Sequence, residues 1–201
     1  MRVDDLRALY NHRKRVIILL IIINELIDAV IIITSLDFSN MVNFIRIISV
    51  AMITSFISII LLNKYLTYNT SLTIINDIEE IFEDFTLFGD KIFAKYKADD
   101  RIFLIIKLGF FGSAQYYLFA FKNFVSTEES EKYPRMSKGT RTELDGFKFY
   151  KMTGNFVIPT PNGNIDGEGT ALMFNNIHLR MSRKLPKDAL KLLIETIRNE
   201  L

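Results

Sequence analysis

Cysteine and tryptophan are absent from the 201-residue chain, and histidine occurs only twice. Without cysteine the chain has no disulfide framework, no thiolate zinc site and no thiol nucleophile. This absence also fits a reducing compartment. The sequence contains no Walker loop, Rossmann fingerprint, HExxH motif or nucleophile elbow. We therefore expect a protein that is not an enzyme and that holds no cofactor and no metal.

What the chain has in excess is apolar sequence near its N-terminus. Two runs, residues 16–36 and 44–62, are each long enough to cross a hydrocarbon core of roughly 30 Å as a helix. A short segment, residues 37–43, separates them, which predicts an antiparallel hairpin. The first run is longer than the apolar part of a signal peptide, and no small-x-small cleavage site follows it before the second run. We expect residues 1–65 to form a membrane anchor.

Basic residues near the ends of the two runs predict the orientation of the hairpin. Five of them precede the first run and Lys64 follows the second, whereas segment 37–43 has no lysine or arginine. Since such residues are enriched on the cytoplasmic side, both termini are expected in the cytoplasm, with the hairpin in the cell inner membrane. The five residues are Arg2, Arg7, Arg13, Lys14 and Arg15.

Residues 66–201 are enough for one small cytosolic domain. Apolar residues between 74 and 96 recur at helical spacing, which predicts an acidic helix over 72–97 that continues the second membrane span. Segment 102–125 is long enough for a third span. However, Lys107, Lys122 and two glycines favour two buried strands joined near Gly112.

The rest of the domain predicts strands, loops and a closing helix. The expected fold is a membrane α-helical hairpin of two transmembrane helices followed by a cytosolic α+β domain with an antiparallel sheet. The expected segments are a loop over 126–146, short strands over 147–152 and 155–158, a turn-rich loop over 159–169, a strand over 170–182 and an amphipathic helix over 186–201.

Polar residues interrupt the first apolar run at Asn24, Glu25 and Asp28. An acid at the centre of a bilayer costs at least about 2–3 kcal/mol, so such a residue usually has a function. Glu25 and Asp28 are spaced to lie on one helical face. Two interpretations stay open: a polar seam that lines an ion path, or protonated acids that join helices by hydrogen bonds. Both predict self-association.

Basic residues gather towards the C-terminus. Residues 132–201 hold 12 basic and 7 acidic residues, whereas residues 66–131 hold 6 basic and 11 acidic residues. The two halves are suited to attract each other, and the basic half is suited to an anionic ligand. Arginine pairs well with phosphate, and a helix N-terminus favours anions. The residues predicted to bind phosphate are His178, Arg180, Arg183, Lys184 and Lys187, with an ordinary solvated sheet face as the alternative.

Two further patterns are weaker. Residues 162–167 match the first half of an EF-hand loop, but Met173 stands where the bidentate glutamate belongs, so a glycine-rich turn is the preferred interpretation. Tyr116 and Tyr117 are suited to stack on a nucleotide base, although buried packing is the commoner role of such residues.

A two-span hairpin followed by a small β-containing domain resembles a class of prokaryotic anti-phage membrane effectors from CBASS and type III CRISPR systems. In that class the soluble domain senses a cyclic oligonucleotide, and the membrane part assembles and disrupts the inner membrane. The resemblance lies in the architecture of the whole chain, and no motif carries it. The helix expected over 72–97 departs from the β-barrel type of this class, whose barrel begins directly after the spans.

These observations lead to a membrane-anchored sensor-effector as the first hypothesis. Its basic half binds a cyclic oligonucleotide, its hairpins associate with the lipid bilayer and with other copies of the chain, and it binds no DNA. A non-enzymatic accessory subunit of a membrane complex is one alternative, and it predicts a protein partner instead of a nucleotide. A small ion-conducting subunit that uses Glu25 and Asp28 is the other.

Overall fold

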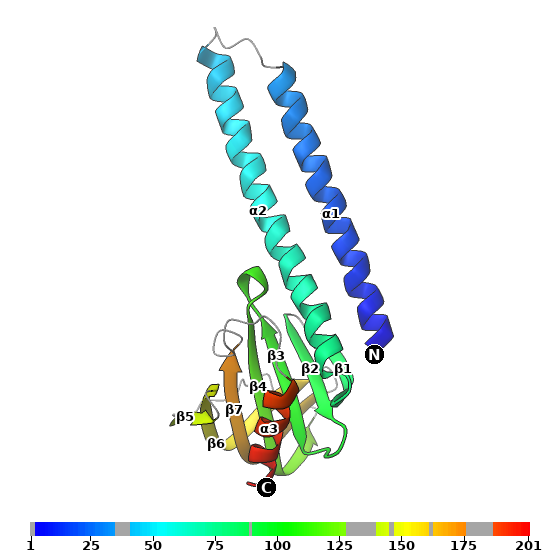
Figure 1. Cartoon of the computed structure of the whole chain (residues 1–201), viewed down its shortest axis with the longest axis vertical. Helices are drawn as coiled ribbons and strands as arrows, with labels where there is room; N and C mark the ends of the chain where they lie inside the picture. The colour runs from blue at the N-terminus through cyan, green and yellow to red at the C-terminus, as the bar shows by residue number, and fades with distance from the viewer. Residues whose placement is uncertain are drawn as a thin grey trace.

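The computed structural model describes residues 3–34, 41–88, 90–127, 140–144, 147–160, 163–175 and 187–201. Two long helices run side by side as a hairpin above a sheet domain, and the N-terminus lies near that domain (Figure 1). The helices are α1 (Val3–Thr34), α2 (Met41–Ile78) and α3 (Lys187–Arg198). The strands are β1 (Phe82–Phe88), β2 (Lys91–Tyr96), β3 (Ile102–Leu108), β4 (Ala114–Thr127), β5 (Thr140–Leu144), β6 (Phe147–Thr160) and β7 (Gly163–Asn175).

Both hairpin helices are long and apolar enough to cross a membrane. Only 11% of the most apolar stretch of α1 and 6% of that of α2 is buried, whereas the core helix of a soluble protein is mostly buried. Leu26 on α1 and Phe56 on α2 are 61% and 65% exposed. A continuous apolar surface of this kind fits hydrocarbon and not water. The two helices thus indicate a membrane protein.

Helix α2 extends beyond its apolar run and enters the sheet domain. Its 38 residues span about 57 Å, almost twice the thickness of a hydrocarbon core. Near its C-terminal end, Ile74, Ile75 and Ile78 are fully buried in the domain core. The prediction that the second span continues into the domain is confirmed. The expected boundary between residues 65 and 66 falls inside this one helix.

The predicted helix over 72–97 is wrong beyond Ile78, because residues 82–96 form the β1–β2 hairpin. A β-bulge explains the misleading pattern. The register of β1 shifts between Glu83 and Thr86, and Asp84 adopts a φ of 53°. The extra residue lets Phe82 and Phe85 both be buried at a spacing of three, which resembles one face of a helix. Pairing with the neighbouring strand then overrides the local preference.

The described strands form one antiparallel sheet in the order β1-β2-β3-β4-β7-β6-β5. Segment 102–125 is β3 and most of β4, joined through a short 3-10 turn at Phe110–Gly112. The predicted strand pair is therefore confirmed, and a third membrane span is excluded. The two short strands expected over 147–158 are one strand, β6.

Two of the expected loops contain strands. Strand β5 lies inside the loop expected over 126–146, and β7 occupies most of the loop expected over 159–169. Polar and glycine-rich sequence predicts turns here, but pairing of β5 with β6, and of β7 with β4 and β6, holds both segments extended. Of the strand expected over 170–182, residues beyond 175 lie outside the described part of the chain.

Both faces of the sheet bury apolar side chains. One face packs against the base of α2 and against α3, whose Leu190, Leu193 and Ile197 are buried as the amphipathic pattern predicts. Leu6 and Tyr10 of α1 join the same core, so the first turns of this helix belong to it too. The opposite face holds an aromatic cluster drawn from strands, with Phe103, Phe119, Phe121, Met152, Phe156, Ile158 and Ala171 at its centre.

Small residues of β7 leave room for the close backbone of β4 and for aromatic side chains that meet across this strand. Gly169 lies opposite Phe121 of β4 and Gly154 of β6, next to a register shift between Phe121 and Asn123. A Cβ atom at Gly169 would overlap the backbone of Ala120. Across this strand, Phe119 of β4 meets Phe156 of β6 edge to face, with ring centroids 5.5 Å apart.

We expect Gly169→Ala to lower the free energy of unfolding of the sheet domain by about 1–3 kcal/mol, because the added methyl group pushes against backbone that has little room to move. Thermal unfolding of the full chain in detergent micelles, followed by circular dichroism, measures this. Glu168→Ala is the matched control, since Glu168 is exposed and is the residue directly before Gly169 in β7. Equal midpoints for the two variants would contradict the close approach at Gly169.

Candidate functional site

A cluster of polar side chains lies between α1 and α2, inside the apolar part of the hairpin. Asn24, Glu25 and Asp28 come from α1, and Thr54 and Ser58 come from α2. Asn24 is 9% exposed and Thr54 is 7% exposed, among neighbours that mostly face outward. We call these five residues the hairpin polar cluster.

Hydrogen bonds of the hairpin polar cluster join the two helices. The Asn24 side-chain Nδ2 donates to the Thr54 backbone oxygen at 3.1 Å and to Ser58 Oγ at 2.9 Å. Ser58 Oγ in turn donates to Glu25 Oε1 at 2.9 Å. Since hydrocarbon offers no competing water, these bonds fix the register of α1 against α2.

Asp28 is the member of the cluster that has an oxygen without a hydrogen-bond partner in the hairpin. Its Oδ1 atom is buried and has no hydrogen-bond partner. An unsatisfied polar atom in apolar surroundings costs free energy, and a carboxyl group at membrane depth costs more than a neutral one. Because this oxygen is already shielded inside the hairpin, a bound ion, a water or a rearrangement of the two helices on association is needed to satisfy it. The sequence points to both Glu25 and Asp28, but their hydrogen bonding differs in the structure. Glu25 has a partner within the hairpin, and Asp28 Oδ1 has none.

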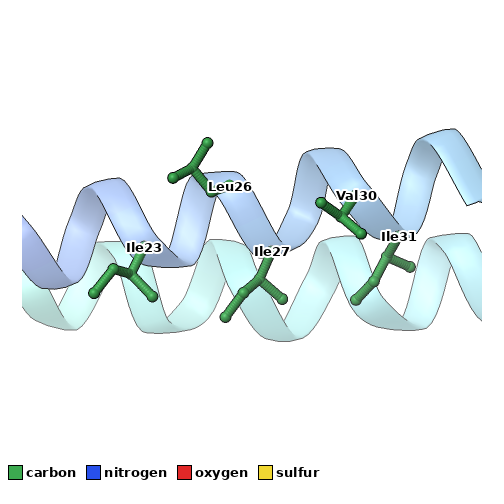
Figure 2. A pocket seen from close by; sticks show the side chains of 5 residues that line it. All are labelled: Ile23, Leu26, Ile27, Val30 and Ile31. Carbon is green, nitrogen blue, oxygen red and sulfur yellow. The ribbon is translucent and has the colours of Figure 1, made fainter.

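An apolar groove runs along the same turns of α1. It has a volume of about 270 Å³ and is lined by Ile23, Leu26, Ile27, Val30 and Ile31 (Figure 2). All five side chains are branched and aliphatic, so the groove suits an apolar side chain of another helix or a lipid acyl chain.

The predicted phosphate site is only partly described. His178, Arg180, Arg183 and Lys184 lie outside the described residues, so their role stays a prediction. Lys187 begins α3, and its Nζ lies 2.9 Å from Glu80 Oε2. This hydrogen bond lowers the pKa of the Glu80 carboxyl. The pair joins the acidic and basic halves of the domain, and an anion at Lys187 has to compete with Glu80.

A polar depression of about 480 Å³ lies at the β2–β3 turn. The sequence did not point to it, because Glu83 of β1 approaches the turn only in the folded chain. Its charged lining is balanced, with three basic and three acidic residues, so it does not favour an anion. Arg101 donates two hydrogen bonds to Asp99 at 3.0 and 2.9 Å and lowers the pKa of that carboxyl.

The weaker patterns take structural roles. Asn164 and Asp166 pair with strands on both sides within β7, so they belong to the sheet and not to a calcium loop. In the described part of the chain no group of three acidic or histidine side chains is placed to hold a metal. Tyr116 is fully buried and stacks on Phe174 with centroids 5.1 Å apart, and burial raises the pKa of its hydroxyl. Tyr117 is partly buried on the opposite face.

Comparisons of the chain with protein family models, with curated proteins and with solved structures find no match. The functional proposal therefore rests on the hairpin polar cluster and on the packing of α1 and α2 into the sheet domain.

We expect Asn24→Leu to lower the stability of the hairpin by about 0.6–2 kcal/mol, because it removes both hydrogen bonds to α2. Unfolding of the full chain in bicelles by added dodecyl sulfate, followed by circular dichroism, measures the change. Leu26→Ala is the control, since Leu26 is 61% exposed and makes no interhelical hydrogen bond. A stability unchanged by Asn24→Leu would show that the polar cluster does not hold the hairpin together.

Proposed function

We propose that the protein is a membrane-anchored effector whose hairpins assemble through the acidic side of α1 and thereby perturb the bilayer, under the control of the sheet domain. The buried Asp28 Oδ1 without a partner carries this proposal. When hairpins associate, the two helices shift so that a neighbouring hairpin supplies the missing donor, and the apolar groove on the same turns of α1 accepts side chains of that neighbour.

Attachment of both hairpin helices to the sheet domain supports control from that domain. Helix α2 is continuous into the core, and Leu6 and Tyr10 of α1 are buried there. Arg7 of α1 forms an ion pair with Glu79, and Lys14 donates to Asn69 Oδ1 at 2.7 Å. A change in the domain therefore reaches both helices at once. For a ligand to drive assembly, it has to bind the assembled state more tightly than the separate chains.

One departure from the anti-phage class is smaller in the structure than the sequence predicts. The helix expected over 72–97 distinguishes this chain from the β-barrel type of that class, whose barrel begins directly after the spans. In the structure, α2 ends at Ile78 and β1 begins at Phe82, so the helix beyond the second apolar run is shorter than predicted. We therefore propose an inner-membrane homo-oligomer with cytoplasmic termini. Its activating ligand is a cyclic oligonucleotide bound by the basic half, with His178, Arg180, Arg183, Lys184 and Lys187 as the phosphate-binding residues.

The ligand is tested by the thermal stability of the full chain in nanodiscs, with cyclic di-, tri- and tetranucleotides added one at a time. A ligand that binds only the folded state raises the free energy of unfolding by about 2.7 kcal/mol at a hundredfold excess over Kd, and the unfolding midpoint rises with it. We expect one of these nucleotides to raise the midpoint and linear dinucleotides to have no effect. A folded chain that responds to none of them would contradict the sensor and favour an accessory subunit with a protein partner.

Assembly is tested by Asp28→Leu, which removes the buried carboxyl group. We expect association in liposomes to weaken about tenfold, or about 1.4 kcal/mol, together with loss of dye leakage. Glu25→Gln is the matched control, because its side chain keeps an oxygen that can accept from Ser58. Crosslinking and single-molecule photobleaching report the association. An Asp28→Leu variant that assembles like the unaltered chain would contradict the proposal.

The same Asp28 oxygen also favours a second candidate, a small ion-conducting subunit. A carboxyl oxygen without a protein partner is suited to line a path for a cation. In this case Asp28→Asn changes the single-channel conductance in planar bilayers while assembly is intact. Loss of assembly in Asp28→Asn would instead assign the residue to helix association.

A further inference from the structure

Two aromatic rings at the β3–β4 turn are exposed in a domain whose other large apolar side chains are mostly buried. Phe110 is 72% exposed and Phe111 is 44% exposed. Their ring centroids lie 5.5 Å apart, edge to face. We call Phe110 and Phe111 the aromatic tip. Elsewhere in the described part of the sheet domain, Val125 and Tyr150 are the large apolar residues with comparable exposure.

Hydrogen bonds hold the aromatic tip in one conformation. The backbone N–H of Phe111 donates to Asn63 Oδ1 of α2 at 2.6 Å. Within the turn, the N–H of Gly109 donates to the Ser113 oxygen at 2.8 Å, and the N–H of Ser113 donates to the Phe110 oxygen at 3.0 Å. These contacts fix the backbone that carries the two rings.

The backbone of the aromatic tip is strained. Phe111 has a φ of 50°, in the left-handed region that a bulky residue rarely adopts. Gly112 follows with a φ of 74° and packs so closely on α2 that a Cβ atom would overlap the Thr70 hydroxyl. Such strain persists only when the surroundings fix it, and it is commonest at functional positions.

The aromatic tip lies where α2 leaves the membrane. Asn63, its hydrogen-bond partner, directly follows Leu62, the last residue of the second apolar run. The β3–β4 turn is the part of the sheet domain that rises farthest alongside the hairpin (Figure 1). With residues 44–62 in hydrocarbon, this position corresponds to the level of the lipid headgroups.

Neighbouring residues on the helices have the composition of a membrane interface. The Lys14 ammonium lies 5.2 Å from the ring centroid of Tyr65, and the Arg13 guanidinium lies 5.8 Å from that of Tyr68. Aromatic rings and basic side chains of this kind mark the boundary between hydrocarbon and water. In a chain without tryptophan, tyrosine and phenylalanine have to form this belt.

We propose that the aromatic tip inserts into the interfacial layer of the leaflet that α2 leaves, so that the sheet domain is held against the membrane at a third point beside α1 and α2. The occupant is phospholipid, because the tip continues the belt of the spanning helices and two rings are too small a surface for a stable protein interface. Insertion fixes the tilt of the sheet domain on the bilayer. This inference rests on the hairpin spanning the membrane and does not depend on the proposed ligand or effector role.

The absence of tryptophan makes a direct test possible, since Phe110→Trp introduces a single tryptophan whose emission is recorded by selective excitation. The variant is reconstituted as the full chain in nanodiscs of phosphatidylcholine and phosphatidylglycerol, with and without brominated acyl chains. Leu26→Trp, in the middle of the first apolar run (residues 16–36), is the positive control for membrane depth. Val125→Trp is the control for a water-exposed site, because Val125 is 64% exposed. Ala114 lies beside the tip, and Val125 is about 36 Å farther along β4.

We expect Phe110→Trp to emit at a shorter wavelength than Val125→Trp and to lose intensity in brominated lipid, although less than Leu26→Trp. Emission and quenching equal to those of Val125→Trp would overturn the proposal. A blue-shifted emission without quenching by brominated lipid would also overturn it, since protein and not lipid would then cover the tip. A nitroxide label on Phe110→Cys gives a second measurement, since the chain has no other cysteine. We expect its accessibility to oxygen to exceed that of a water-exposed site, and an equal accessibility would overturn the proposal.

Discussion

One helix has to satisfy two different surroundings, and the rest of the structure follows from this. In its first part α2 exposes large apolar side chains such as Met52 and Phe56, which only hydrocarbon accommodates. In its last turns Ile74, Ile75 and Ile78 are buried among strands. Because the backbone is helical throughout, no flexible linker separates the membrane part from the sheet domain. The sheet has to form around a helix whose direction the bilayer sets.

Polar contacts are concentrated in two places, inside the apolar hairpin and at the end of α2 that joins the sheet domain. Inside the hairpin, hydrogen bonds of Asn24 and Ser58 satisfy most polar atoms, and Asp28 Oδ1 is left without a partner. Near the membrane surface, Arg7, Lys14 and Asn63 tie α1 and the β3–β4 turn to the lower part of α2. The first set is suited to association between chains, and the second set is suited to transmit changes between the domain and the hairpin.

The sequence predicts the hairpin well because hydrophobic length is a local property. It also predicts the strands at 102–125 and the closing helix, where periodicity and glycine position agree. It fails at residues 82–96, since the bulge at Asp84 gives a strand the spacing of a helix. It fails at 163–169, because pairing on both sides holds a glycine-rich segment extended. Glu25 and Asp28 stand out as charged residues in an apolar run, but only the packed hairpin shows that the Oδ1 atom of Asp28 lacks a partner.

Continuity of α2 across the membrane surface is the central claim, and a distance along the helix tests it most directly. Met41→Cys and Thr73→Cys introduce the only two cysteines, so nitroxide labels attach at these positions alone. Double electron–electron resonance is then recorded in nanodiscs, with the labelled chain diluted in unlabelled chain. An unbroken helix places the two backbone positions about 48 Å apart and gives one narrow distance distribution. A shorter or broad distribution would show that α2 bends or breaks at the membrane surface, and the coupling between hairpin and sheet domain would be lost.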